Sequence, residues 1–262
     1  MYIVFGLLSA LFASLSIIII KLSLLKESST LITFYKTVFI FLITLLLVKE
    51  ININNRDLII ILITGITTSL TWIYYYKSMK KTTLKNIVAI DKISTLFTMF
   101  FAFIFLKEQL NIVSFIFILF GILFMINNIN KVALKNGLIS VFFLSITAVL
   151  SKACIDNNNI ISVAFIRTLV ILLILTLISY KNIKPIKIKT SIYIFLSGLF
   201  TILSWLSFYE GIKLADVSLV MPLEKLNILF TILISREKMN IKEKIGLTFI
   251  LIGTLNLFIV NM

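Results

Sequence analysis

Apolar runs long enough to cross a lipid bilayer recur along the whole chain, and they constrain its fold more than any other feature. An α-helix needs roughly 18 or more apolar residues to cross a hydrocarbon core of about 30 Å. Short polar breaks such as KESST and DNNN separate the runs and leave no room for a soluble domain. We therefore predict an all-α, polytopic membrane protein with ten transmembrane helices, at roughly 2–25, 31–48, 58–76, 86–106, 112–129, 137–155, 160–180, 191–209, 217–235 and 245–261.

The composition agrees with a membrane protein and excludes several kinds of site. The 262 residues are 60% hydrophobic, and their mean hydropathy is +1.12. One cysteine and no histidine exclude a disulfide framework and a zinc site. No Ser-His-Asp set or glycine-rich phosphate loop is present, so we expect no enzyme, no catalytic residues, no metal and no cofactor. The net charge of +14 is typical of basic membrane loops, and no nucleic-acid partner is expected.

The second half of the sequence repeats the first, because rare residue types recur at nearly constant offsets. A shift of 131 residues aligns Gly6 with Gly137, Lys21 with Lys152, and Lys36 with Arg167. A shift of 133 aligns Trp72 with Trp205, Tyr76 with Tyr209, Asp91 with Glu224, and Lys92 with Lys225. A shift of 129 aligns Glu108 with Glu237, so span nine should be about one helical turn shorter than span four. We predict two five-helix repeats, 1–130 and 131–262.

An odd number of spans in each repeat has a consequence for topology. With five spans each, the two repeats must cross the membrane in opposite directions. Inverted repeats of this kind are the architecture of secondary transporters, whose substrate site lies near the bilayer midplane between the halves. We therefore expect a transporter that works by alternating access between the repeats.

The stretches 64–111 and 197–240 resemble the EamA-like family of the drug/metabolite transporter superfamily. The resemblance rests on a Gly-x6-Trp-x3-Tyr spacing, on the acidic-Lys step of spans four and nine, and on Glu108 and Glu237 just after those spans. It covers nearly the whole chain and implies ten helices and carrier-type transport of small metabolites. Ala89 stands where the second repeat has Pro222, so a proline kink is expected in one half only.

Charged residues inside the spans are the main candidates for a site. A charge at the centre of a membrane helix costs roughly 2.5–3.5 kcal/mol, so each should have a partner on another helix. We expect Asp91 to contact Lys21 or Lys36. We expect Glu224 to contact Lys152 or Arg167 in the same way. The charges would form one layer near each membrane face, acting as gates, or two arms of a single site if the helices bend inward.

The balance of these charges indicates the kind of substrate. Six cations face two anions inside the spans: Lys21, Lys36, Lys92, Lys152, Arg167 and Lys225 against Asp91 and Glu224. The surplus favours a small anionic or zwitterionic metabolite, since its carboxylate or phosphate would supply missing partners. Snorkelling to the lipid headgroups is the competing interpretation, and it applies best to Lys21 and Lys152, which are secondary candidates. Arg167 adds a preference for forked, bidentate geometry.

Aromatic residues fall in the same layers as the charges. Trp72, Tyr76, Trp205 and Tyr209 lie towards the ends of spans three and eight. An interfacial aromatic belt is the favoured explanation, and lining of a substrate pocket is the alternative. The substrate-binding or gating candidates are therefore Lys36, Trp72, Tyr76, Asp91, Lys92, Arg167, Trp205, Tyr209, Glu224 and Lys225.

Loop charge bears on orientation in the cell membrane. One face carries 15 Lys and Arg residues and the other carries four, namely Lys49, Arg56, Lys107 and Lys213. The positive-inside rule then places both termini outside, whereas the family resemblance implies termini inside. The expected partners are the lipid bilayer, a small-molecule substrate and a coupling ion, either a proton or sodium. The sequence leaves open whether the protein forms a homodimer. The alternative function is a lipid-linked flippase component or a channel-like permease of the same fold.

Overall fold

A computed structural model describes residues 1–126 and 129–260, and this part of the chain is helical almost throughout, with no strands. Ten membrane-length or near membrane-length helical segments follow one another through short loops. Their bounds are α1 (Tyr2–Leu24), α2 (Ser29–Leu47), α3 (Asn55–Met79), α4 (Leu84–Asp91), α5 (Ile93–Phe101) with η1 (Ala102–Leu106), α6 (Ile112–Met125), α7 (Lys131–Ile155), α8 (Ile160–Ser179) with η2 (Tyr180–Asn182), α9 (Ile188–Leu214), α10 (Val217–Glu224), α11 (Asn227–Ser235) and α12 (Ile241–Val260).

The ten-span, all-α fold is confirmed, with spans four and nine each divided into two half-helices. In the described residues, eight helical segments are long and apolar enough to cross a membrane; α4–η1 and α10–α11 each count as one. The remaining two helices are α6, which has 14 residues, and α12, which has 20 and begins with charged residues. Span four has 23 residues and span nine has 19, which matches the expected difference of one turn. A π-helical turn at Ala102–Leu106 accommodates the longer span.

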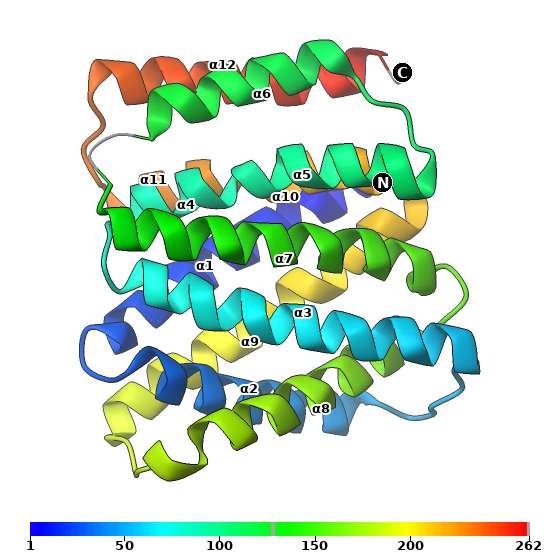
Figure 1. Ribbon diagram of the computed structural model, residues 1–262, viewed down its shortest axis with the longest axis vertical. Coiled ribbons are helices and arrows are strands. Elements are labelled where there is room, and N and C mark those ends of the chain that lie inside the picture. The colour runs from blue at the N-terminus through cyan, green and yellow to red at the C-terminus, as the bar shows by residue number, and fades with distance from the viewer. Residues whose placement is uncertain (127–128, 261–262) are drawn as a thin grey trace.

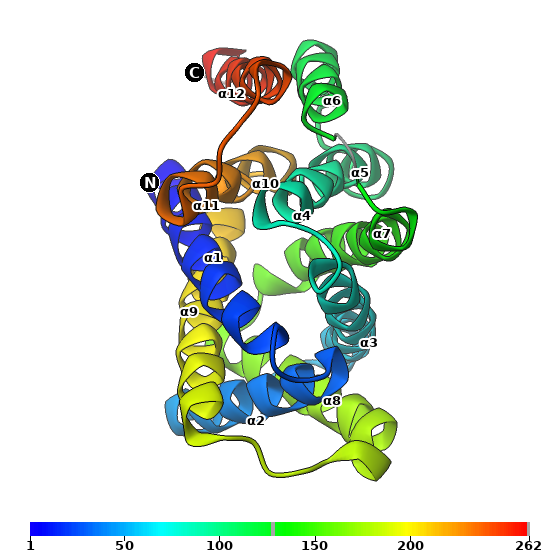
Figure 2. The ribbon, with the colours of Figure 1, turned by 90° about the vertical axis from the view of Figure 1, so that its left-hand side faces the viewer.

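The helices lie side by side in stacked pairs, with one member of each pair from each repeat (Figure 1). Helix α1 packs on α9, α3 on α7, and α2 against α8. Helices α6 and α12 pack on each other and stand apart from the other helices (Figure 2). This arrangement brings the four half-helices α4, α5, α10 and α11 together between the α6–α12 pair and the rest of the bundle.

The two repeats are inverted and make equivalent contacts. Helix α1 begins and α12 ends at one end of the bundle, whereas α7 begins at the opposite end (Figure 1). The Ser9 hydroxyl donates to the carbonyl of Ser204 at 2.9 Å, and its counterpart Ser140 donates to the carbonyl of Thr71 at 3.0 Å. These matched bonds tie α1 to α9 and α7 to α3.

Two glycines allow the half-helices to approach closely. A Cβ atom at Gly6 would lie 2.7 Å from Cβ of Leu223, and one at Gly137 would lie 2.6 Å from Cγ2 of Ile90. Real Cβ atoms do not come this close, so any larger residue would push α10 away from α1 or α4 away from α7. The glycines therefore fix the positions of the half-helices that carry Asp91 and Glu224.

Two glutamates hold the beginnings of the half-helices across the repeat boundary. The Glu108 carboxylate accepts the backbone N–H groups of Val217 and Ser218 at 3.0 and 2.8 Å. The Glu237 carboxylate accepts those of Leu84 and Lys85 at 3.0 and 2.9 Å. The first N–H groups of a helix have no intrahelical partner and carry partial positive charge, so a carboxylate stabilises them. We call these two contacts the glutamate clamps.

A left-handed residue precedes each clamp. Lys107 has φ 59° and Arg236 has φ 53°, and these are the positive-φ residues of the described chain. The left-handed conformation ends the preceding helix and turns the backbone so that the next residue, the clamp glutamate, faces the other repeat. Each clamp thus connects the end of one repeat's span to the beginning of the other repeat's half-helix.

Candidate functional site

Interruptions in spans four and nine lie at equivalent residues. Helix α4 ends at Asp91 and α5 resumes at Ile93, while α10 ends at Glu224 and α11 resumes at Asn227. The expected kink in one half only is therefore wrong. Pro222 removes one backbone donor from α10, but span four is interrupted in the same place with Ala89 there. The interruptions follow the acidic-Lys steps and not the proline.

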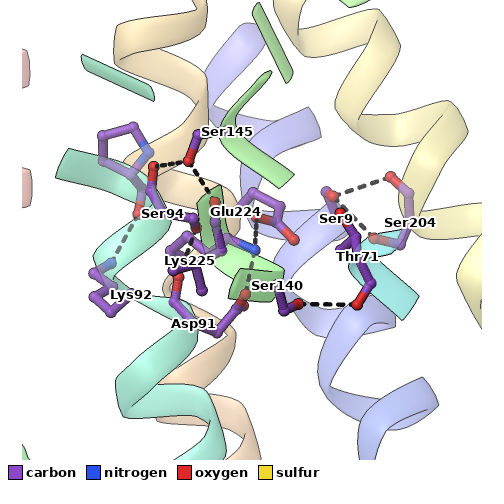
Figure 3. A network of polar contacts seen from close by, with 12 residues as sticks. Ser9, Thr71, Asp91, Lys92, Ser94, Ser140, Ser145, Ser204, Glu224 and Lys225 are labelled. Carbon is purple, nitrogen blue, oxygen red and sulfur yellow. Dashed lines mark hydrogen bonds and ion pairs between the residues drawn. The ribbon is translucent and has the colours of Figure 1, made fainter. Parts of the chain in front are cut away.

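The interrupted spans bring the charged side chains of both repeats into one network (Figure 3). The ammonium of Lys225 lies 2.8 Å from Oδ2 of Asp91 and 2.9 Å from Oε2 of Glu224. The Lys92 ammonium donates to the carbonyl of Pro222 at 3.2 Å and is fully buried. Lys225 thus forms ion pairs with two carboxylates, whereas the equivalent Lys92 donates to a backbone carbonyl near the end of α10.

The expected partners of the two acids are wrong. Asp91 pairs with Lys225, and neither Lys21 nor Lys36 forms an ion pair with it; Glu224 also pairs with Lys225, and neither Lys152 nor Arg167 does so. The physical reason is that the interruptions of spans four and nine meet each other inside the bundle. The prediction that the charged residues form two separate layers near opposite membrane faces is wrong for the same reason. The alternative prediction, in which the charges of both repeats belong to one site, describes the arrangement.

Lys36 points into this region from α2 and is held by aromatic and hydroxyl groups. Its ammonium donates to the Tyr76 hydroxyl at 2.8 Å and to the Ser16 hydroxyl at 3.1 Å. It also lies 5.3 Å from the centre of the Trp72 ring. The side chain is buried, and no carboxylate in residues 1–126 and 129–260 forms an ion pair with it.

Arg167 occupies the equivalent position on α8. Its guanidinium carbon lies 3.8 Å from the centre of the Trp205 ring and 5.0 Å from that of Tyr209. The side chain is 3% exposed, and its Nε atom has no hydrogen-bond partner among residues 1–126 and 129–260. Within the described part of the chain Arg167 forms no ion pair. A buried cation of this kind is costly unless a counter-charge is supplied.

The two tryptophans stack on each other between these cations. Their ring centres are 5.3 Å apart with an angle of 25° between the planes. Trp72 and Tyr76 are buried, as is Tyr209, and Trp205 is partly buried. The favoured interpretation of an interfacial aromatic belt is therefore wrong, because spans three and eight turn these faces towards each other and away from the surface.

Two adjoining cavities lie within this arrangement. The first cavity has a volume of about 120 Å³ and is lined by Lys36. The second has a volume of about 80 Å³ and is lined by Arg167. Both are lined by the tryptophan pair and by Glu224 and Lys225. Asp91 and Tyr76 line the first, and Tyr209 lines the second. Nine of the twelve candidate residues thus border one of the two cavities.

The other three candidates have structural contacts. Lys21 donates to the carbonyls of Met79 and Thr82, the latter at 2.6 Å, and Lys152 donates to the carbonyl of Ile212 at 2.6 Å. These lysines satisfy carbonyl groups at or near the ends of α3 and α9, where the helix dipole favours a cation. Their ammonium groups bond inside the protein, so snorkelling to the headgroups does not describe them. Lys92 is buried beside the first cavity without lining it.

The sequence analysis missed several neutral polar residues of the cavities. Asn227 lines the first cavity, and its amide oxygen is buried without a partner in the described residues. Tyr75 belongs to the aromatic cluster for which pocket lining was the alternative; it lines the same cavity, and its buried hydroxyl likewise has no partner there. Thr71 and Ser204 line both cavities. Polar side chains within apolar spans were the available signal, but serine and threonine are too common in this chain for that signal to select them. In the described residues no group of three His, Cys, Asp or Glu could hold a metal ion.

Ten spans in two inverted repeats, with buried charges at a central junction, define a polytopic membrane transporter. The chain belongs to the EamA-like transporter family, whose model matches residues 1–127 and 132–259.

Two relatives add to this assignment. A Sinorhizobium protein described as an uncharacterized transporter in the cobO 3' region is 34% identical over 128 residues, which are 45% of this chain and 91% of that protein. That relative is thus about the length of one repeat. A solved structure, titled only as the crystal structure of a protein, has a TM-score of 0.75 at 12% identity, covering 97% of this chain and 94% of its own. At that identity the likeness concerns the fold alone.

Proposed function

We propose that this protein is a secondary transporter that moves a small anionic or zwitterionic metabolite by alternating access between its two repeats. The observation that carries the proposal is Arg167, a buried guanidinium that borders a cavity and forms no ion pair with any described residue. A ligand carboxylate or phosphate would supply that charge in the bidentate geometry that arginine favours.

The charge balance of the site supports an anion. Asp91 and Glu224 already share Lys225, with Lys92 close behind it on the carbonyl of Pro222. Among the cations that line the two cavities, Lys36 and Arg167 are then the two without an acidic partner in the described residues. A zwitterion could still bind, with its anionic end at Arg167 and its cationic end towards the carboxylates.

The size and position of the cavities support a small ligand carried between repeats. Volumes of about 120 and 80 Å³ suit a compact metabolite and not a lipid tail. Lys36 of the first repeat lines one cavity and Arg167 of the second repeat lines the other. The stacked tryptophans border both cavities. Rocking of one repeat against the other would change the access of each cavity to its side of the membrane.

The test is a binding screen with purified protein. Trp72 and Trp205 are the only tryptophans in the chain, so intrinsic fluorescence reports on the site directly. Amino acids, organic acids and phosphorylated metabolites would be titrated against it, followed by uptake into proteoliposomes. We expect at least one anion to change the fluorescence and to be transported.

The matched variant is Arg167→Met, which keeps an unbranched side chain and removes the charged guanidinium. Loss of charge-assisted hydrogen bonds of roughly 1.5–3 kcal/mol should weaken binding by about 10- to 100-fold. Arg56→Met, at an exposed position in the first turn of α3 that lines neither cavity, is the control and should bind normally. Normal anion binding by Arg167→Met would contradict the proposal.

A further inference from the structure

The ammonium of Lys225 is shared by two carboxylates and also borders both cavities. Oδ2 of Asp91 and Oε2 of Glu224 both lie within 2.9 Å of the same nitrogen atom. The two acidic oxygens therefore cannot be further apart than twice that distance. Lys225 is 4% exposed, and Figure 3 shows its side chain between the two acids.

An anion entering either cavity would compete with the carboxylates for this lysine. Lys225 lines the cavity of Lys36 as well as that of Arg167. A ligand carboxylate or phosphate within reach of Lys225 offers it a third acidic partner. Any shift of the ammonium towards the ligand withdraws the cation that Asp91 and Glu224 share.

Two carboxylates this close cannot both stay ionised without a cation between them. Two like charges in a shared, buried site repel each other, and one proton bound between them removes that repulsion. The neighbouring Lys92 attracts both acids through space, but its ammonium is bonded to the carbonyl of Pro222 and forms no ion pair in the described residues. Withdrawal of Lys225 therefore favours protonation of the pair.

Few other groups near the two carboxylates could neutralise them in place of a proton. Helix α3 contributes the Tyr75 hydroxyl, which borders the first cavity together with both acids. Helices α1, α7 and α9 contribute neutral hydroxyls near the network, from Ser9, Ser140 and Ser204 (Figure 3). The remaining charged or titratable groups border the far parts of the cavities: Lys36, Tyr76, Arg167 and Tyr209.

We propose that the Asp91–Glu224 pair is the coupling-ion site, and that binding of an anion at Lys225 is accompanied by uptake of one proton from water onto this pair. The proton bonds to a carboxylate oxygen and no other bond forms or breaks. The carrier then moves an anion together with a proton, so that a monoanion crosses without net charge. This inference rests on the proposed function and specifies its coupling.

The experiment uses the full-length protein in detergent and three anions whose charge is constant near neutral pH: lactate, glutamate and methanesulfonate. Binding is followed by tryptophan fluorescence at several pH values, and proton uptake by a pH-sensitive dye in weakly buffered solution. For the tightest-binding anion we expect one proton taken up per anion bound, and an affinity that falls about tenfold for each unit of pH increase.

Two variants make the assignment specific. In Asp91→Asn and in Glu224→Gln, one acid is gone and Lys225 is released from it. We expect each variant to bind the anion more tightly at high pH than the wild type, with no pH dependence and no proton uptake. Glu210→Gln removes an exposed carboxylate of α9 and should behave as the wild type. Two acidic positions keep the test valid if one variant fails to fold.

Several outcomes would overturn the inference. Anion binding that is independent of pH and releases or takes up no proton would leave the transporter proposal standing and remove the coupling. A requirement for sodium in place of protons would do the same. Failure of these three anions and of every anion in the binding screen to bind would remove the anion site, and the proposed function would fall together with its coupling.

Discussion

The glutamate clamps and the central charge network are both duplicated in sequence, yet only the clamps are duplicated in their contacts. Glu108 and Glu237 each accept two backbone N–H groups from the opposite half-helix at 2.8 to 3.0 Å. Lys92 and Lys225, in contrast, have different partners, a carbonyl in one case and two carboxylates in the other. The two clamp glutamates keep the same role in both repeats, whereas the two lysines of the central charge network have diverged in role.

The largest effect that would sharpen this contrast is expected at Lys225. Lys225→Met leaves two carboxylates buried without a cation and should lower the free energy of unfolding by about 3–5 kcal/mol. Lys92→Met removes one hydrogen bond to a carbonyl and should cost about 1–3 kcal/mol. Reversible unfolding in detergent measures both values. Equal losses in the two variants would show that the lysines are equivalent after all.

A smaller and symmetrical effect is expected at the clamps. Glu108→Gln and Glu237→Gln each keep an acceptor oxygen but lose charge-assisted bonds to two N–H groups, so each should cost about 1–2 kcal/mol. The same unfolding measurement applies, with Glu210→Gln as the exposed control. The comparison breaks if one clamp variant is much less stable than the other, because the two contacts would then not be equivalent.

The smallest effect is expected at the lysines near the helix ends. Lys21→Met and Lys152→Met remove donors to carbonyls at the ends of α3 and α9, each at a cost of about 0.5–1.5 kcal/mol. Because neither lysine borders a cavity, anion affinity should not change. Fluorescence titration of the two variants tests this, and a shared loss of affinity would place them in the site.

Sequence patterns predicted the architecture better than they predicted contacts. Span lengths and offsets led to ten helices in inverted repeats, since apolar length and odd span number are properties of the chain itself. The pairing of Asp91 with Lys225 was not predictable from spacing, because it depends on how two interrupted helices meet. Trp72 and Trp205 were assigned to a belt for a related reason: their depth was visible in the sequence, but their direction was not.

Orientation in the membrane stays a prediction. The 15-to-4 distribution of loop charge favours termini outside, and the beginning of α1 and the end of α12 lie at one end of the bundle (Figure 1). A reporter fused after Met262 that is active only outside the cytoplasm would agree with the charge count.

The glutamate clamps have a consequence for biosynthesis. Helix α4 leaves the ribosome long before Glu237, the residue that satisfies its first N–H groups. Until the second repeat is made and inserted, those groups have no carboxylate to accept them, and Glu108 has no α10 to hold. The first repeat can therefore complete its contacts only after the second repeat has been made. If the two halves were kept apart, the first N–H groups of α4 and α10 would lack their carboxylate acceptors.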